Sequence, residues 1–263
     1  MERLAIVLAV LSLAVVGVSA WLRLYGAGLG CADWPACYGQ ILTAASHSPP
    51  PLGRLAHRIV ATAALLLTIY LAWAGWRARP RPAWARPVLV VLGLMLFLSV
   101  VGIWSKDPTR ITVNFINLLG GMALVPMSWR IALAARGETA TGRPDPVLRL
   151  GMALLSVTVM LGALIGASYA ALDDSARGLA LHWLHRGLAI LAVLILGRAA
   201  LARRETAAGR VMLGLLGATA GLGLLLVLAD LPLWAAVGHN IAAAALLAGA
   251  VSLRAAKSAG SAR

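Results

Sequence analysis

The chain alternates between long apolar stretches and short polar segments. Eight of the apolar stretches are about 20 residues long, the length that an α-helix needs to cross a hydrocarbon layer of roughly 30 Å. We therefore expect an all-α integral membrane protein with eight transmembrane helices. The predicted spans lie near residues 3–23, 53–76, 87–105, 111–131, 147–170, 179–200, 211–229 and 233–253.

Polar positions inside these stretches divide them into two related sets of four. A His-Arg pair at residues 57–58 of the second stretch recurs at residues 185–186 of the sixth. Aligning the fourth stretch with the eighth sets Asn117 against His239. Four crossings return the chain to its starting side, so the two sets have the same orientation and form a parallel repeat. The pattern predicts two four-helix bundles.

The boundary between the halves falls in a polar segment that contains glycine and proline. We expect an N-terminal half at residues 1–135, a linker at 136–146 and a C-terminal half at 147–263. The first apolar stretch follows a short charged start, as in a signal peptide, but its length and its place in the repeat favour a retained helix. A long outer loop at residues 24–52 has the length of a functional loop and is placed to cover the first half.

Composition and charge agree with a membrane protein. The sequence is 61% hydrophobic and 12% charged, whereas a soluble domain is about 25% charged. A net charge of +14 would suggest nucleic acid in a soluble protein. Here sixteen of the 23 Lys and Arg residues fall in the tails and loops of one side. The positive-inside rule makes that side, with both termini and the linker, cytoplasmic, and no nucleic-acid partner is needed to explain the charge.

The intramembrane histidines are the strongest functional signal, because an ionisable side chain in a bilayer costs several kcal/mol unless it has a partner. His185 and His239 come from different helices near their outer ends, the arrangement of the two axial ligands of a six-coordinate haem. The alternative for a single histidine is an interhelical hydrogen bond. His57 faces Asn117, a poor iron ligand, which leaves a five-coordinate site or none.

Two further histidines and two cysteines carry weaker signals. His182 lies one turn before His185 and could form a His-x-x-His pair, but a solvated or propionate-contacting role is favoured. His47 is assigned no site. Cys31 and Cys37 lie in the outer loop, where an oxidising compartment favours a disulfide. Two free thiols or a metal pair are the alternatives.

Residues 26–39, Gly-Ala-Gly-Leu-Gly-Cys-Ala-Asp-Trp-Pro-Ala-Cys-Tyr-Gly, resemble the first outer loop of the haem A synthase family. The two His-Arg pairs and His239 fit the same pattern, so that the resemblance covers essentially the whole chain. It implies a cofactor haem b in the second half, held by His185 and His239. The first half would bind haem O and oxidise its methyl group to the formyl group of haem A, and Cys31 and Cys37 would form a disulfide.

The resemblance also implies contacts and partners. His57, Arg58 and Asn117 would contact the substrate haem, Arg186 would contact a haem propionate, and no other metal is expected. The implied partners are haem O synthase, terminal-oxidase assembly factors and a quinone or other electron donor; homo-oligomerisation is left open. The implied location is the cytoplasmic (inner) membrane, with the haem sites near its outer face.

Two positions depart from the family pattern. Members carry an acidic residue three positions before the histidine of the second span, where this chain has Arg54, and a second histidine at the position of Asn117. No other acid replaces the lost one, which leaves the catalytic residue unknown. The alternative hypothesis is therefore a non-catalytic haem-binding membrane protein in oxidase assembly or electron transfer. A transporter built on the parallel repeat is less favoured, because broken helices and intramembrane carboxylates are missing.

Overall fold

A computed structural model describes residues 1–26, 51–104, 110–138, 145–168 and 176–255. Over these residues the chain forms eight α-helices and no strand, and each helix is long and apolar enough to cross a membrane. The predicted all-α membrane fold is therefore confirmed. The helices are α1 (Glu2–Gly26), α2 (Pro51–Arg77), α3 (Ala85–Trp104), α4 (Ile111–Ala135), α5 (Pro146–Ser168), α6 (Ala176–Leu201), α7 (Ala207–Leu228) and α8 (Leu233–Ala255).

Several helices are longer than the apolar stretches that predicted them. Helix α1 continues to Gly26 and α6 begins at Ala176, each about one turn beyond the predicted span. The reason is that hydropathy measures only the part of a helix that crosses the hydrocarbon, whereas the helix itself continues into the interface. The predicted number and order of spans hold, and only their ends move.

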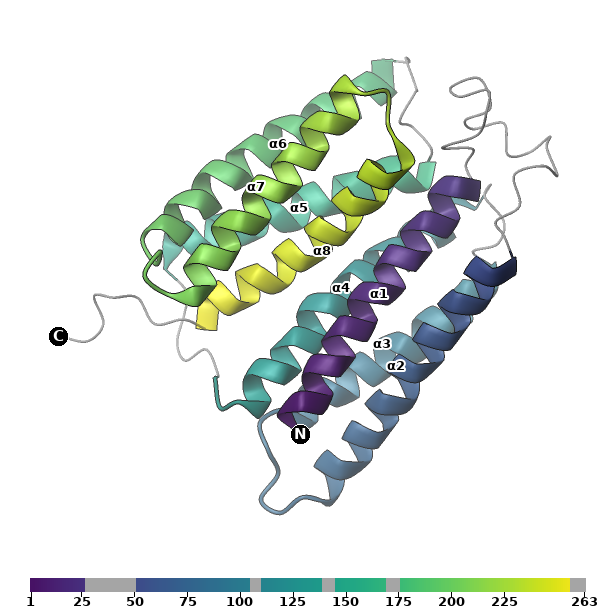
Figure 1. The fold of residues 1–263 in the computed structure, drawn as a ribbon, viewed down its shortest axis with the longest axis vertical. Coiled ribbons are helices and arrows are strands. Elements are labelled where there is room, and N and C mark those ends of the chain that lie inside the picture. Colours follow the sequence, from purple (N-terminus) through teal and green to yellow (C-terminus); the bar gives the residue numbers. More distant parts are fainter. Residues whose placement is uncertain (27–50, 105–109, 139–144, 169–175, 256–263) are drawn as a thin grey trace.

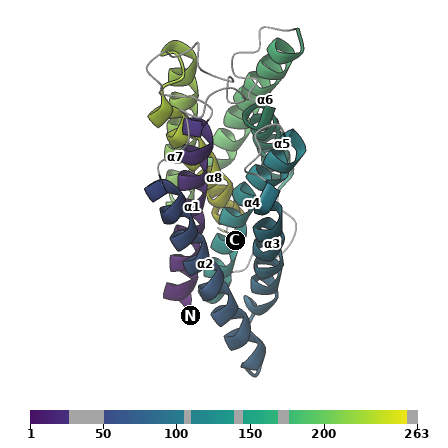
Figure 2. The ribbon, with the colours of Figure 1, turned by 90° about the vertical axis from the view of Figure 1, so that its right-hand side faces the viewer.

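The helices are arranged as two rings of four that share a seam. In the first half α1, α2, α3 and α4 contact one another in chain order, and α4 returns to α1. In the second half α5, α6, α7 and α8 do the same, with α8 returning to α5. Contacts between the halves involve α1, α4, α5 and α8, so that α8 packs on both α1 and α4 (Figure 1). Figure 2 shows the helices running along a common long axis.

Corresponding helices of the two halves bury corresponding positions. When His57 is matched with His185, most buried residues of α2 fall on those of α6, and each of the other three helix pairs, aligned with an offset of its own, also matches several buried residues. This shared register supports the predicted repeat. Among the matched buried pairs are Ala64/Ala192, Thr68/Leu196, Leu71/Ala199 and Ala72/Ala200 in α2/α6; Ser12/Leu155, Val16/Val159 and Ala20/Ala163 in α1/α5; Val91/Met212 and Met95/Leu216 in α3/α7; and Met122/Ala244, Leu124/Leu246, Ser128/Ala250 and Ile131/Leu253 in α4/α8.

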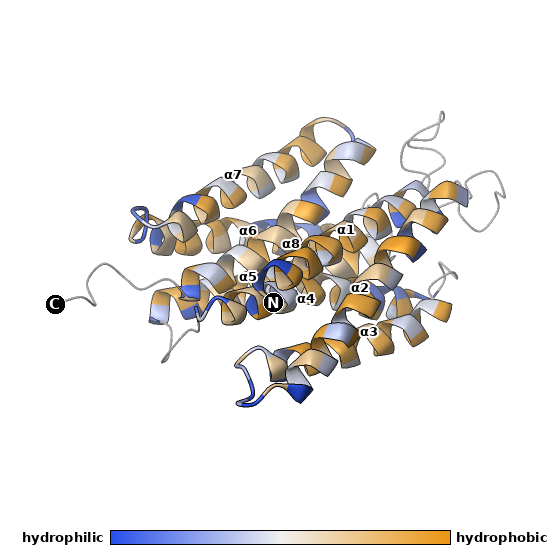
Figure 3. Cartoon of the chain, turned by 60° about the horizontal axis from the view of Figure 1, so that its bottom comes forward, coloured by the Kyte–Doolittle hydropathy of each residue, from blue (hydrophilic) through white to orange (hydrophobic). Residues whose placement is uncertain are grey.

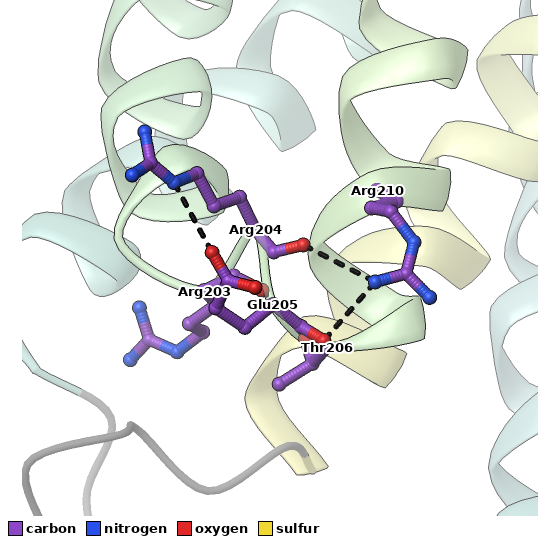
Figure 4. Close-up of polar contacts among 5 residues, drawn as sticks. All are labelled: Arg203, Arg204, Glu205, Thr206 and Arg210. Atoms are coloured by element: carbon purple, nitrogen blue, oxygen red, sulfur yellow. Dashed lines mark hydrogen bonds and ion pairs between the residues drawn. The ribbon is translucent and has the colours of Figure 1, made fainter.

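The helix bundle has one strongly basic end. Helix α1 begins and α8 ends there, and the α2–α3 and α6–α7 connections lie at the same end (Figure 1). Hydrophilic residues gather in these connections, while hydrophobic residues cover the helices between the ends (Figure 3). In the α6–α7 connection Arg210 donates to the carbonyls of Arg204 and Glu205 (Figure 4). We call this the basic end and the opposite one the histidine end.

Polar side chains cap the helices at the basic end. Asp145 accepts a hydrogen bond from the Leu148 amide at 2.8 Å, which caps the start of α5, and pairs with Arg203 at 2.6 Å. Thr206 accepts from the Gly209 amide at 3.0 Å and caps α7. These bonds satisfy amide groups that the first turn of a helix leaves unpaired.

Candidate functional site

The candidate site begins with histidines placed on the inward faces of their helices. His57 lies seven residues, or two turns, before the buried Ala64 of α2, and His185 lies seven before the buried Ala192 of α6. Side chains with that spacing share one helix face. Both histidines lie about 9–14 Å from the start of their helix, and this start is at the histidine end.

His185 is fixed by a hydrogen bond to the neighbouring helix. Its Nδ1 atom lies 3.0 Å from the carbonyl oxygen of Thr158 on α5. A carbonyl only accepts, so the imidazole must donate from Nδ1–H. The neutral ring then has its lone pair on Nε2, the form in which histidine binds a metal.

His239 on α8 is held in the same way by α7. Its Nδ1 atom lies 3.1 Å from the carbonyl oxygen of Thr219 and donates to it. Each of the two histidines thus donates a hydrogen bond to the preceding helix in the chain, from α6 to α5 and from α8 to α7. Both therefore leave Nε2 as the free acceptor.

The two histidines come from diagonal members of the second ring. Helices α6 and α8 are separated by α5 on one side and α7 on the other. His185 lies on α6 and His239 on α8, and both side chains are partly buried. Two imidazoles with free Nε2 atoms, placed on diagonal helices of a four-helix ring, fit the donor set of a six-coordinate haem.

The first-half candidates are arranged differently. His57 and Asn117 lie on α2 and α4, the diagonal members of the first ring. Both are partly buried, but no hydrogen bond joins the His57 ring to another described residue. Arg54 is exposed one turn before His57. Arg58 is also exposed and lines a shallow hollow on the outward side of α2 with Ile59, Thr62, Ala63 and Leu66.

Arg186 points away from the interior of the ring. Its guanidinium lies over the Trp183 ring, 5.6 Å from the centroid, and both residues are exposed. A propionate bound by Arg186 would lie at the edge of the bundle, where the outer part of a large ligand would reach it. The predicted contact of Arg186 with a propionate stays a prediction.

The predicted cysteine pair lies outside the described residues. Cys31, Cys37 and His47 all belong to residues 27–50, so the disulfide stays a prediction. Among the described residues no group of three or more His, Cys, Asp or Glu side chains gathers as a metal site.

Sequence reasoning missed four residues around the histidines. Thr158 and Thr219 act through their backbone carbonyls, which no sequence pattern reveals. Arg23 at the end of α1 donates to Asn240 of α8 at 3.4 Å, directly after His239. The sequence does hold a hint of this contact. Arg23 is a charged residue near the end of an apolar stretch, and Asn240 is a polar residue directly after the candidate ligand His239.

Fold and site together define a polytopic helical membrane protein with paired, oriented intramembrane histidines. A family model described as cytochrome oxidase assembly protein matches residues 2–49. Haem A synthase of Shewanella oneidensis is 27% identical over 90% of this chain and 91% of its own length. Haem A synthase of Symbiobacterium thermophilum is 35% identical over 34% of this chain and 28% of its own length. The chain is thus similar to a haem A synthase over most of its length and to the cytochrome oxidase assembly family over residues 2–49.

Proposed function

We propose that this protein is a membrane oxidoreductase of haem A biosynthesis, which oxidises the methyl group of haem O to the formyl group of haem A for terminal oxidases. The observation that carries the proposal is the diagonal pair His185 and His239, each with Nδ1 bonded to a backbone carbonyl. Relatives named haem A synthase support the assignment to this pathway.

The second half would hold the cofactor. His185 and His239 would hold the iron of a haem b through their Nε2 atoms, and the haem would supply one-electron transfer. We assign the substrate to the first half, so that cofactor and substrate have separate sites.

The first half would hold haem O, with His57 as the inward-facing ligand and with Arg58 and Asn117 as further contacts. Converting a methyl to a formyl group adds one oxygen atom and removes four electrons and four protons when water supplies the oxygen. Helix α8, which carries His239, packs directly on α1 and α4 of the first half. The contact between Arg23 and Asn240 crosses the same seam. These contacts join helices of the half that would hold the cofactor to helices of the half that would hold the substrate.

The orientation that we propose places the basic end in the cytoplasm and the histidine end at the outer face of the cytoplasmic membrane. The arginines of the basic end support this orientation through the positive-inside rule. The proposed partners are a haem O synthase that supplies the substrate, terminal-oxidase assembly factors that receive the product, and a quinone or other redox partner.

A non-catalytic haem-binding protein is the second candidate, and the first half favours it. Arg54 stands where the family carries an acid, and Asn117 stands where it carries a histidine. A transporter is less well supported, because every Asp and Glu of the described residues lies at a helix end or in a connection. A proton-coupled transporter would be expected to place a carboxylate inside its helices.

Purification with a haem O supply tests the proposal. We expect a reduced-minus-oxidised haem b spectrum that is lost in His185→Ala and His239→Ala, and haem A or a hydroxylated intermediate in the extracted pigment. A spectrum that is absent, or unchanged in both variants, would overturn the haem assignment. A normal spectrum without any oxidised product, with haem O present, would establish the non-catalytic alternative.

A further inference from the structure

Each candidate ligand of the second half is seated in a notch of the neighbouring helix. On α5 the notch consists of the Thr158 carbonyl and Gly162, and on α7 it consists of the Thr219 carbonyl and Gly223. In both helices the glycine comes four residues after the threonine, one turn further along the same face. The missing side chain therefore leaves space directly beside the carbonyl that accepts from the histidine.

The glycines are the positions where a side chain would strike the ring. A Cβ atom on Gly162 would lie 3.0 Å from Cε1 of His185 and 3.5 Å from its Nδ1. A Cβ atom on Gly223 would lie 3.2 Å from Cε1 of His239 and 3.5 Å from its Nδ1. The same edge of each imidazole, from Nδ1 to Cε1, thus lies against the helix surface that carries the accepting carbonyl.

We propose that Gly162 and Gly223 are positioning residues, which let His185 and His239 approach a backbone carbonyl closely enough to fix their tautomer and ring orientation. The inference rests on the proposed haem site. A histidine ligand whose other nitrogen donates to a carbonyl is oriented and made more basic by that bond. The two notches therefore give the cofactor two matched and rigidly held ligands.

The first half repeats the glycine of the α7 notch, since Gly102 of α3 corresponds to Gly223, but it does not repeat the glycine of the α5 notch. In the register of buried positions, Val15 and Ser19 of α1 correspond to Thr158 and Gly162 of α5. A Cβ atom is thus present where the second half has none, and the His57 ring has no hydrogen bond to another described residue. A less constrained ligand suits a haem that must enter and leave, whereas the notched pair suits a resident cofactor.

Alanine substitutions at the notches test this inference, because a Cβ atom at 3.0–3.2 Å forces the ring to move. Controls are Gly166→Ala on α5, where the new Cβ would meet Leu118 at an ordinary 3.5 Å, and Gly221→Ala on α7, where it meets nothing within 4 Å. We expect Gly162→Ala and Gly223→Ala to retain haem about tenfold less well, within the range of ligand-orienting partners. The reduction potential should rise, by about 59 mV for each tenfold loss of preference for ferric haem.

The outcomes separate the inference from the proposed function. Potentials and spectra of Gly162→Ala and Gly223→Ala that match those of the two controls would overturn the notch, even when His185→Ala and His239→Ala lose the haem. A purified protein without a haem spectrum that depends on both histidines would overturn the proposed function itself.

A second measurement needs no substitution at the notches. In haem-free protein labelled with ¹⁵N-histidine, nuclear magnetic resonance should show His185 and His239 with the proton on Nδ1, with signals assigned by their loss in the alanine variants. A proton on Nε2 of either ring would overturn the inference, because that tautomer cannot donate to the threonine carbonyl.

Discussion

At the scale of single residues, Asp145 joins a helix cap to an ion pair. Its hydrogen bond from the Leu148 amide and its contact with Arg203 hold the pKa of the carboxyl below its ordinary value of about 3.9, while partial burial opposes that shift. A carboxyl with a lowered pKa stabilises the fold above its ordinary pKa, and this stabilisation is lost as the pH falls through the lower folded value.

Substitution of Asp145 separates the two interactions. Asp145→Ala removes the cap and the charge and should cost about 1 kcal/mol at neutral pH. Asp145→Asn keeps an N-cap acceptor and should cost less, because an ion pair whose carboxylate is 39% exposed contributes little. Melting temperatures in detergent would show these losses. The difference between wild type and Asp145→Ala should shrink below about pH 4; a constant difference there would contradict the assignment.

At the scale of elements, the start of α7 depends on a glycine that helix propensity alone would disfavour. A Cβ atom on Gly209 would collide with the backbone carbonyl of Arg203 and lie 2.9 Å from that of Ala200. Neither carbonyl moves as freely as the end of a side chain. The α6–α7 turn and the Thr206 cap can therefore form as they do only with glycine at this position.

Gly209→Ala should destabilise the protein by about 1–3 kcal/mol, the usual cost of overpacking. Gly214→Ala, on the same helix with nothing within 4 Å, is the matched control. It should be neutral or stabilising by up to about 1 kcal/mol, since alanine is the better helix former. Thermal unfolding in detergent measures both. Equal losses in the two variants would show that helix flexibility, not the contact with Arg203, determines the effect.

The helices themselves were predictable because each one carries its own signal. A run of about 20 apolar residues can bury its backbone in a bilayer only as a helix. The order and number of the helices therefore follow from the local sequence. The inward positions of His57 and His185 follow as well, because helical spacing ties them to a buried stripe. The notches could not be predicted from the sequence. The hydrogen-bond acceptor is a backbone carbonyl on another helix, and the space beside it exists because glycine has no side chain.

At the scale of the whole molecule, the two rings of helices differ in the polar residues that they carry. Both rings bury matching positions and place their polar residues at the histidine end on diagonal helices. Only the second ring combines two histidines with two notches, while the first has His57, Asn117 and the exposed Arg54. The seam formed by α1, α4 and α8 joins them: Gly17 of α1 packs against Ile241, and Trp129 of α4 donates to Ser252 at 2.6 Å.

Restoring the family residues in the first ring tests whether these departures limit activity. Asn117→His places a second imidazole on the helix diagonal to His57, and Arg54→Glu places an acid one turn from it. Since a positioned acid or base contributes about 10²–10⁴-fold to a rate, we expect the double variant to raise haem A formation by on the order of 10²-fold, more than either single change. Haem A per bound haem b, measured by mass analysis, normalises for protein amount.

Arg177→Glu is the matched control for that experiment, because it makes the same change of charge at an exposed position of α6 at the histidine end. It should leave haem A formation unchanged. A double variant that keeps its haem b but forms no more haem A than the control would show that the first ring has lost more than two side chains. The difference between the rings would then indicate that the first ring has lost catalysis, and the protein would be the non-catalytic haem-binding alternative.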